Sequence, residues 1–247
     1  MQKQPHYFTS EKLDIDGEIW CICLFEESLW IGGIIPWSSK PNEDNCIIYQ
    51  FTGKRENLVP RFRGHNDRVR SLIVWSKYLC SASHDGDIRI WDETKNETLL
   101  AWKAHSTWIT VLCAWGQSLI SGGADGKLKL WSIDEGLKTP QMIREFEQFQ
   151  DWICSVLCFP DEMWVSDYEG TLAVWTKDFA LKRKTFSRDH AIRILYSTEL
   201  NGSKVVAGGS IATQNASKIF LWNHEGQVIA KLPTNASVYA LCLWKGW

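Results

Sequence analysis

The chain has 247 residues, of which 45% are apolar and 23% are charged, and this balance is typical of a globular protein with a sizeable core. Its formal net charge is −2, so no overall excess of positive charge favours binding to nucleic acid or to an anionic membrane. No apolar run approaches the roughly 18 residues that a membrane-spanning helix requires, and the polar, acidic N-terminus lacks the apolar centre of a secretory signal.

Taken in chain order, the sequence is a series of short strands arranged in recurring units. The first unit begins near Gly17 and contains CICLF, SLWIGG and CIIYQF. In the later units the third strand ends on a tryptophan, and these closing tryptophans are Trp91, Trp131, Trp175 and Trp222. Their spacings are 40, 44 and 47 residues, which is a period typical of repeat architectures. In the first unit the equivalent place falls on Tyr49 or Gln50.

The second unit shows the strands of one repeat most clearly. Residues 68–75, 78–83 and 87–91 are rich in β-branched and aromatic residues and read as strands, and residues 97–104 supply a fourth. Asp85-Gly86 separates the second and third strands, and Asp-Gly is a favoured pair for a tight hairpin turn. No long stretch of the chain has convincing helical periodicity. Four-stranded units at this period predict an all-β protein folded as a β-propeller.

Two units resemble the WD40-repeat family, because Gly64-His65 opens one and Trp91-Asp92 closes its third strand, and Ala104-His105 and Trp131-Ser132 do the same in the next. The resemblance implies a structural tetrad in each: His65, Ser81, Asp85 and Trp91, then His105, Ser121, Asp125 and Trp131. A buried imidazole needs hydrogen-bond partners, and a carboxylate, a hydroxyl and an indole N–H can satisfy it. The same His, Ser and Asp recur at one spacing in two repeats, whereas an active site is expected only once. They therefore indicate a structural hydrogen-bond network within each blade rather than a catalytic triad.

The last two complete units depart from this pattern. The fourth has Glu169 in the turn, Val165 in place of the serine and Phe149 near the histidine position. The fifth keeps Asp189-His190 but carries extra residues in TELNGSKVVAGGSIATQNAS.

The sequence therefore predicts one propeller domain, 1–247, with about five complete blades and a truncated sixth. Residues 17–223 hold five repeats, and residues 224–247 hold the outer strand of the fifth blade and an incomplete sixth repeat. Residues 1–16 are a candidate outer strand that would close the ring. Trp244 is equivalent to Trp75, and SVYALCLW reads as an innermost strand without its next two. Two explanations stay open: a piece of a six- or seven-bladed ring, which is favoured, or a ring that a partner chain completes.

The eight cysteines are too sparse for a disulfide framework in a chain of this length. Six of them fall in apolar, strand-like runs: Cys21, Cys23, Cys80, Cys113, Cys158 and Cys242. The sequence has no Cys-x-x-Cys pair, so reduced, buried thiols are expected, with a cytoplasmic or nuclear location, no metal and no cofactor.

The repeat register places one set of side chains on the face of the propeller that carries the Asp-Gly turns, called here the turn face. These residues precede the first strand, lie at its start or stand just before the turn acid. The predicted partner-binding residues are Trp20, Arg68, Arg70, His84, Trp108, Trp152, Tyr168, Arg193 and Tyr239. Tryptophan, tyrosine and arginine are the residues of interaction hot spots, although simple packing between blades is the alternative. Arginine binds carboxylate or phosphate bidentately, so an acidic or phosphorylated peptide fits this face.

The function expected from these features is that of a non-catalytic protein–protein interaction scaffold. It could be the recognition domain of a larger protein, such as a ubiquitin ligase receptor, a kinase or a trafficking adaptor. The alternative is a propeller associated with RNA, DNA or phosphoinositide through the basic run at residues 181–188, although a solvated edge strand explains that run better. A propeller enzyme is less favoured, because no catalytic motif stands out and no small-molecule substrate is expected.

Overall fold

The computed structural model describes residues 15–35, 39–52, 58–134, 136, 138–146, 149–186, 190–200, 203–212 and 217–241. Within these ranges all the regular elements are strands, and twenty of them form five antiparallel sheets of four. In each sheet the strands lie in chain order, so each sheet is one repeat of the sequence, and we call the sheets blades 1 to 5.

The strands have the following bounds. Blade 1 contains β1 (Glu18–Phe25), β2 (Ser28–Ile34), β3 (Ile48–Phe51) and β4 (Leu58–Phe62). Blade 2 contains β5 (Val69–Trp75), β6 (Tyr78–Ser83), β7 (Asp87–Asp92) and β8 (Glu97–Lys103). Blade 3 contains β9 (Ile109–Trp115), β10 (Ser118–Gly123), β11 (Leu128–Ile133) and β12 (Pro140–Phe146). Blade 4 contains β13 (Ile153–Cys158), β14 (Glu162–Asp167), β15 (Thr171–Thr176) and β16 (Leu181–Phe186). Blade 5 contains β17 (His190–Leu200), β18 (Ser203–Ala212), β19 (Lys218–Asn223) and β20 (Val228–Pro233).

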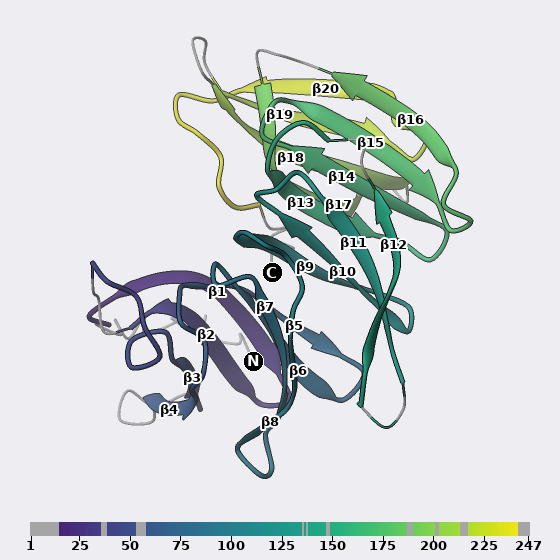
Figure 1. Ribbon diagram of the computed structural model, residues 1–247. Helices are drawn as coiled ribbons and strands as arrows, with labels where there is room; N and C mark the ends of the chain where they lie inside the picture. Colours follow the sequence, from purple (N-terminus) through teal and green to yellow (C-terminus); the bar gives the residue numbers. More distant parts are fainter. Residues whose placement is uncertain are drawn as a thin grey trace, which may run out of the picture.

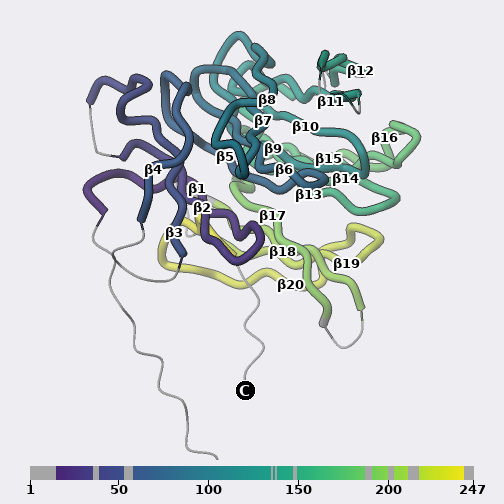
Figure 2. Tube along the Cα trace, turned by 90° about the horizontal axis from the view of Figure 1, so that it is seen from below, coloured from purple at the N-terminus to yellow at the C-terminus, as the bar shows by residue number. Residues whose placement is uncertain are grey.

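The blades succeed one another around a central opening, with the first strand of each nearest the middle (Figures 1 and 2). The innermost strands contact one another in chain order: β1 lies beside β5, β5 beside β9, β9 beside β13 and β13 beside β17. Among the described residues this series does not continue with a comparable contact from β17 back to β1. The arrangement is that of propeller blades, and the space between blades 5 and 1 is the place where the ring would close.

Apolar side chains fill the space between successive blades, and a glycine on a second strand often makes room for them. A Cβ added to Gly32 would lie 2.8 Å from Cγ1 of Val69 on the next blade, and one added to Gly122 would lie 2.5 Å from Cγ2 of Ile153. A Cβ on Gly209 would meet Val238 in the same way. The blades therefore pack through a branched residue of one innermost strand and a small residue of the preceding blade.

The same irregularity interrupts all five innermost strands. The pairing register of each with its second strand shifts by one residue, at Trp20, Arg70, Thr110, Cys154 and Arg193. A β-bulge re-aims the side chain at its centre and locally ends regular pairing. These five residues thus hold equivalent places near the central opening, at the turn-face end of the strands.

Pairing between strands corrects two details of the repeat alignment. Leu79 pairs with the closing Trp91, and the equivalent Leu29 pairs with Phe51, so Phe51 holds the closing place in blade 1, and neither Tyr49 nor Gln50 does. His190 lies only two residues before the bulge-flanking Ile192, whereas His65 lies four residues before Val69. His190 is therefore not the equivalent of His65.

Blade 5 accommodates its extra residues partly by a longer hairpin. The β17–β18 pairing extends past Thr198 and Val205 as far as Leu200 and Ser203. Residues 213–216, 1–14 and 242–247 lie outside the described residues, and with them most of the candidate closing strand and the end of the predicted sixth innermost strand.

Candidate functional site

Each of blades 2 and 3 contains a hydrogen-bonded tetrad. In blade 2, Nδ1 of His65 lies 2.8 Å from Oδ2 of Asp85, and its Nε2 lies 2.7 Å from Oγ of Ser81. Trp91 donates its indole N–H to the same hydroxyl over 2.8 Å. His65 and Ser81 are buried, so the chain of bonds pairs polar groups that would otherwise be costly to bury.

The tetrad of blade 3 repeats this geometry. His105 Nδ1 lies 3.1 Å from both carboxylate oxygens of Asp125, and His105 Nε2 lies 2.8 Å from Ser121 Oγ. Trp131 donates to that hydroxyl over 2.9 Å. The same tetrad lies in the interior of two blades, so its role is structural. It joins the loop before each blade, which carries the histidine, to the second strand with the serine and the third strand with the tryptophan.

The tetrad aspartates are held ionised by their hydrogen bonds. Burial alone would raise the pKa of Asp85, but the bond to His65 and the backbone N–H donors of Asp87 and Asn66 outweigh it and lower the pKa to about 2. The pKa of Asp125 is lowered by the same balance of burial against the bond from His105. An acceptor-only carboxylate in each turn fixes the loop that carries the neighbouring surface residues.

Blade 4 replaces the tetrad with apolar contacts. Phe149 lies with its ring centroid 5.5 Å from that of Trp175, and Val165 is buried in the same cluster. In blade 5, Gly208 stands in the serine place, where a Cβ would collide with the ring of Trp222. Within the described residues, the complete tetrad is therefore found in blades 2 and 3.

Five aromatic side chains form a continuous series across the turn face, which we call the aromatic arc: Trp20, His84, Trp108, Trp152 and Tyr168. Successive ring centroids lie 6.3, 4.8, 5.5 and 6.0 Å apart, and the rings of His84 and Trp108 are stacked with an interplanar angle of 11°. The four larger side chains are between 38% and 43% exposed. They contact one another along the surface while presenting much of their rings to solvent, which packing between blades alone would not produce.

A recurring backbone hydrogen bond positions this arc. The N–H before the turn acid donates to the carbonyl at the start of the first strand in blades 2, 3 and 4: His84 to Arg68 over 3.0 Å, Ala124 to Trp108 over 2.8 Å, and Tyr168 to Trp152 over 2.9 Å. Each bond ties a turn residue to the residue beside it on the rim. The arc thus rests on rigid elements of successive blades.

An arginine stands at each end of the aromatic arc. Cζ of Arg70 lies 4.6 Å from the ring centroid of Trp20, and Cζ of Arg193 lies 5.0 Å from that of Tyr168. Both distances are in the range of cation–π contacts. Arg70 and Arg193 belong to blades 2 and 5, so the combined surface draws on all five blades.

The side chains of the two remaining predicted rim residues are not part of the series of ring contacts. Arg68 forms an ion pair with Asp67, with 3.2 Å between Nη1 and Oδ1. Tyr239 is strongly exposed, and among the described residues no ring contact joins it to the arc. Seven of the nine predicted partner-binding residues are thus in one connected surface. Burial lowers the pKa of His84 to about 4, so this member of the arc is a neutral ring near pH 7.

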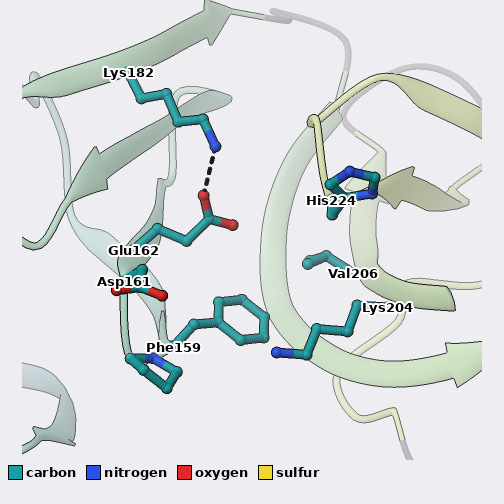
Figure 3. A pocket seen from close by; sticks show the side chains of 8 residues that line it. Phe159, Asp161, Glu162, Lys182, Lys204, Val206 and His224 are labelled. Carbon is teal, nitrogen blue, oxygen red and sulfur yellow. Dashed lines mark hydrogen bonds and ion pairs between the residues drawn. The ribbon is translucent and has the colours of Figure 1, made fainter.

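A cleft of about 250 Å³ lies between blades 4 and 5, at the end of the sheets opposite the turn face (Figure 3). Lys182 is paired with Glu162 over 2.8 Å, and Lys204 Nζ lies 5.7 Å from the ring centroid of Phe159. The described residues that line this cleft include no Ser, Thr or Cys nucleophile. Of the charged side chains that line the cleft, Lys182 and Glu162 therefore neutralise each other.

Two thiols in the described part of the chain, those of Cys113 and Cys158, share a hydrogen bond. Seven cysteines are free there, and of these only Cys46 and Cys80 are fully buried. No group of three or more His, Cys, Asp or Glu side chains in those ranges is placed to hold a metal ion. A search for membrane spans over the same residues finds no helix long and apolar enough to cross a bilayer.

Comparison with known proteins identifies the repeats. Residues 56–92 and 96–132 match the family model for the WD domain, G-beta repeat, known as WD40. Each segment contains the last strand of one blade and the first three strands of the next, so the first runs from β4 to β7 and the second from β8 into β11. Together with the repeated four-stranded sheets, the two matched segments are consistent with a propeller built of WD40 repeats. A search of curated proteins found no significant match.

Solved structures support the fold alone. A crystal structure of the computationally designed Ika8 protein is 20% identical in sequence and superposes with a TM-score of 0.68 over 92% of this chain. The chain spans 65% of that protein. Since 1253 chains of solved structures match, the fold is too widely used to name an activity, and function has to be argued from the site.

Proposed function

We propose that this protein is a protein-interaction module that binds a peptide or protein partner on the aromatic arc. WD40 repeats generally mediate contacts between proteins. The observation that supports this surface is the continuous run of part-exposed rings on the turn face, flanked by Arg70 and Arg193. Large aromatic and arginine anchors on a rigid scaffold are the residues that dominate interface energetics.

The arginines give the proposed partner its chemistry. Arg70 and Arg193 add positive charge at the two ends of an arc of neutral rings, so the partner is expected to contribute negative charge, as an acidic or phosphorylated peptide does. The exposed basic strand β16 lies at the periphery of blade 4, away from this surface. Lys182 of that strand is already paired with Glu162, which supports a structural part for the strand.

The test is partner capture from a cell lysate by purified protein, followed by mass spectrometry and affinity measurement with the recovered partner. We expect the double variant Trp108→Ala/Trp152→Ala to weaken binding by far more than tenfold, because one truncated anchor typically costs about 2 kcal/mol or more. Its melting temperature should stay nearly unchanged, since both side chains project from the surface.

The matched control is a triple change on β16, Lys182→Ala/Arg183→Ala/Lys184→Ala. We expect it to leave capture intact. Capture that survives the loss of both tryptophans and fails in the β16 variant would contradict the proposal and would favour an anionic polymer or lipid as the ligand.

A further inference from the structure

Side chains of one innermost strand meet the next strand according to a recurring rule. Oγ of Ser71, one residue past the bulge of β5, accepts a hydrogen bond from the N–H of Leu112 over 3.3 Å. Oγ of Ser155, at the same place in β13, accepts one from the N–H of Leu195 over 3.0 Å. Both leucines stand two residues past the bulges of their own strands. Because side-chain direction repeats every two residues along a strand, the third residue past one bulge should meet the fourth residue past the next.

At the junction of blades 3 and 4 these two places are occupied by cysteines. Cys113 is the third residue past the bulge of β9, and Cys158 is the fourth past that of β13. Both pack against the apolar cluster between these blades, and their thiols share a hydrogen bond. Just beyond them, Trp115 donates its indole N–H to the carbonyl of Phe159 over 2.6 Å. The two sulfur atoms are therefore neighbours on adjacent strands whose ends are tied together.

The two preceding junctions follow the same rule with other side chains. Between blades 2 and 3, Ile73 and Ala114 pack against one apolar cluster. Between blades 1 and 2, Cys23 and Val74 pack against another. Neither of these junctions places two thiols together, so the pair at the third junction is not a requirement of the repeat. Its two cysteines are partly exposed, which gives a small solute access to them.

We propose that Cys113 and Cys158 form an oxidative modification site, at which a peroxide converts the two thiols into a disulfide that links blades 3 and 4. The sulfur of Cys113 attacks one oxygen of hydrogen peroxide, the O–O bond breaks, and a sulfenic acid and one water are formed. The sulfur of Cys158 then attacks the sulfur of Cys113. An S–S bond forms, the S–O bond breaks, and the thiol proton leaves in a second water. The two thiols lose two electrons in all, and the peroxide gains them.

The shared hydrogen bond favours this order of attack. It lowers the pKa of Cys113 and raises that of Cys158, because the proton of Cys158 stabilises the thiolate of Cys113. The thiolate is the form of cysteine that reacts with peroxide, and Cys158 is then in place to resolve the sulfenic acid. Burial instead raises the pKa of Cys46 to about 12 and that of Cys154 to about 11, so these thiols stay protonated near pH 7.

Mass spectrometry of the purified wild-type protein tests the site. After a brief treatment with hydrogen peroxide, the intact protein should lose the mass of two hydrogen atoms, and dithiothreitol should restore it. A digest prepared without reductant should contain one new linked pair of peptides, which carry Cys113 and Cys158. Because the crosslink is measured in the wild-type protein, this result does not depend on the folding of a variant.

Serine variants separate the two roles. Cys158→Ser should form no disulfide and should accumulate a sulfenic acid at Cys113, which dimedone traps, whereas Cys113→Ser should show neither product. Cys154→Ser is the matched control, because Cys154 lies on the same strand as Cys158, and it should form the disulfide as the wild type does. Full alkylation of both thiols after peroxide treatment would overturn the site. So would a disulfide between other cysteines in its place, or loss of the disulfide in the Cys154→Ser variant.

Discussion

At the scale of single residues, the tetrad of blade 2 makes Asp85 one of the most important polar side chains for stability. Its carboxylate accepts hydrogen bonds from His65 and from the backbone N–H groups of Asn66 and Asp87. We expect Asp85→Ala to lower the free energy of unfolding by about 2–4 kcal/mol, because buried donors lose their acceptor. Trp91→Ala should cost a similar amount, about 2–4 kcal/mol, through the cavity it leaves.

The fourth blade supplies an internal control for that prediction. Glu169 occupies the equivalent turn position but is exposed, and its blade uses apolar contacts in place of the tetrad. Glu169→Ala should therefore change the unfolding free energy by no more than about 0.5 kcal/mol. Urea-unfolding curves of the three variants provide the measurement. Equal effects of Asp85→Ala and Glu169→Ala would show that the tetrad does not stabilise blade 2.

His84 predicts a pH dependence of stability with a definite sign. Burial lowers its pKa in the folded protein from 6.5 to about 4, so the unfolded chain binds more protons in this interval. The free energy of unfolding therefore has its full value, as far as His84 is concerned, above pH 6.5, and it decreases progressively as the pH falls towards 4. Asp85, with a pKa lowered from 3.8 to about 2, loses its contribution only in the lower window, below about pH 4.

The variant His84→Gln removes the titrating ring and should flatten the stability profile between pH 6.5 and pH 4. The decline below pH 4 should persist, because Asp85 is untouched. Melting temperatures across this range measure both effects. A slope between pH 6.5 and pH 4 that is identical in the variant and the wild type would refute the assignment to His84.

At the scale of the elements, a steric rule governs how one blade meets the next. Gly122 on β10 faces Ile153 on β13, and an added Cβ would lie only 2.5 Å from Cγ2 of Ile153. We expect Gly122→Val to destabilise the protein by about 1–3 kcal/mol through overpacking. Combining it with Ile153→Ala should recover part of the loss, and a double-mutant cycle from thermal melts measures the coupling. Additive losses would mean that the two residues do not pack against each other.

The period of the closing tryptophans was enough to predict five units of four strands, because each strand is short and each turn has its own chemistry. The closing place of blade 1 was missed for a physical reason. Phe51 is not a tryptophan, and the longer connection between β2 and β3 removes the fixed count from which its position could be read. Only the pairing of Leu29 with Phe51 settles the register.

Part of the candidate site could be predicted, because its residues stand at a fixed place in each repeat. A bulge recurs at one place in every innermost strand, so aligning the repeats also aligns Trp20, Arg70 and Arg193. Alignment places residues around the opening but gives no distance across it. The ring contacts that join the aromatic arc, and the ion pair of Arg68 with Asp67, therefore required the structure.

At the scale of the whole molecule, the innermost strand of blade 1 is exposed where its counterparts are buried. Ile19 is 43% and Ile22 56% exposed, whereas Val69 and Leu72, at the equivalent places in blade 2, are 0% and 7% exposed because blade 1 covers them. At the other side of the gap, Val238 already packs on Gly209 as Val69 packs on Gly32. Blade 5 thus packs against the segment that follows β20, although residues 234–241 of that segment form no strand. Within the described residues no sheet covers β1.

We therefore expect the protein of residues 1–247 to self-associate, since an uncovered apolar strand favours contact with another copy. Light scattering coupled to size-exclusion chromatography should show an apparent mass that rises with concentration. Ile19→Lys/Ile22→Lys should reduce it towards the monomer mass, because charge on this face opposes docking. Val59→Lys, at an exposed apolar position on the outer strand β4, should not. A monodisperse, cooperatively melting monomer at every concentration would show that β1 is covered within the chain itself and that the ring closes without a further blade.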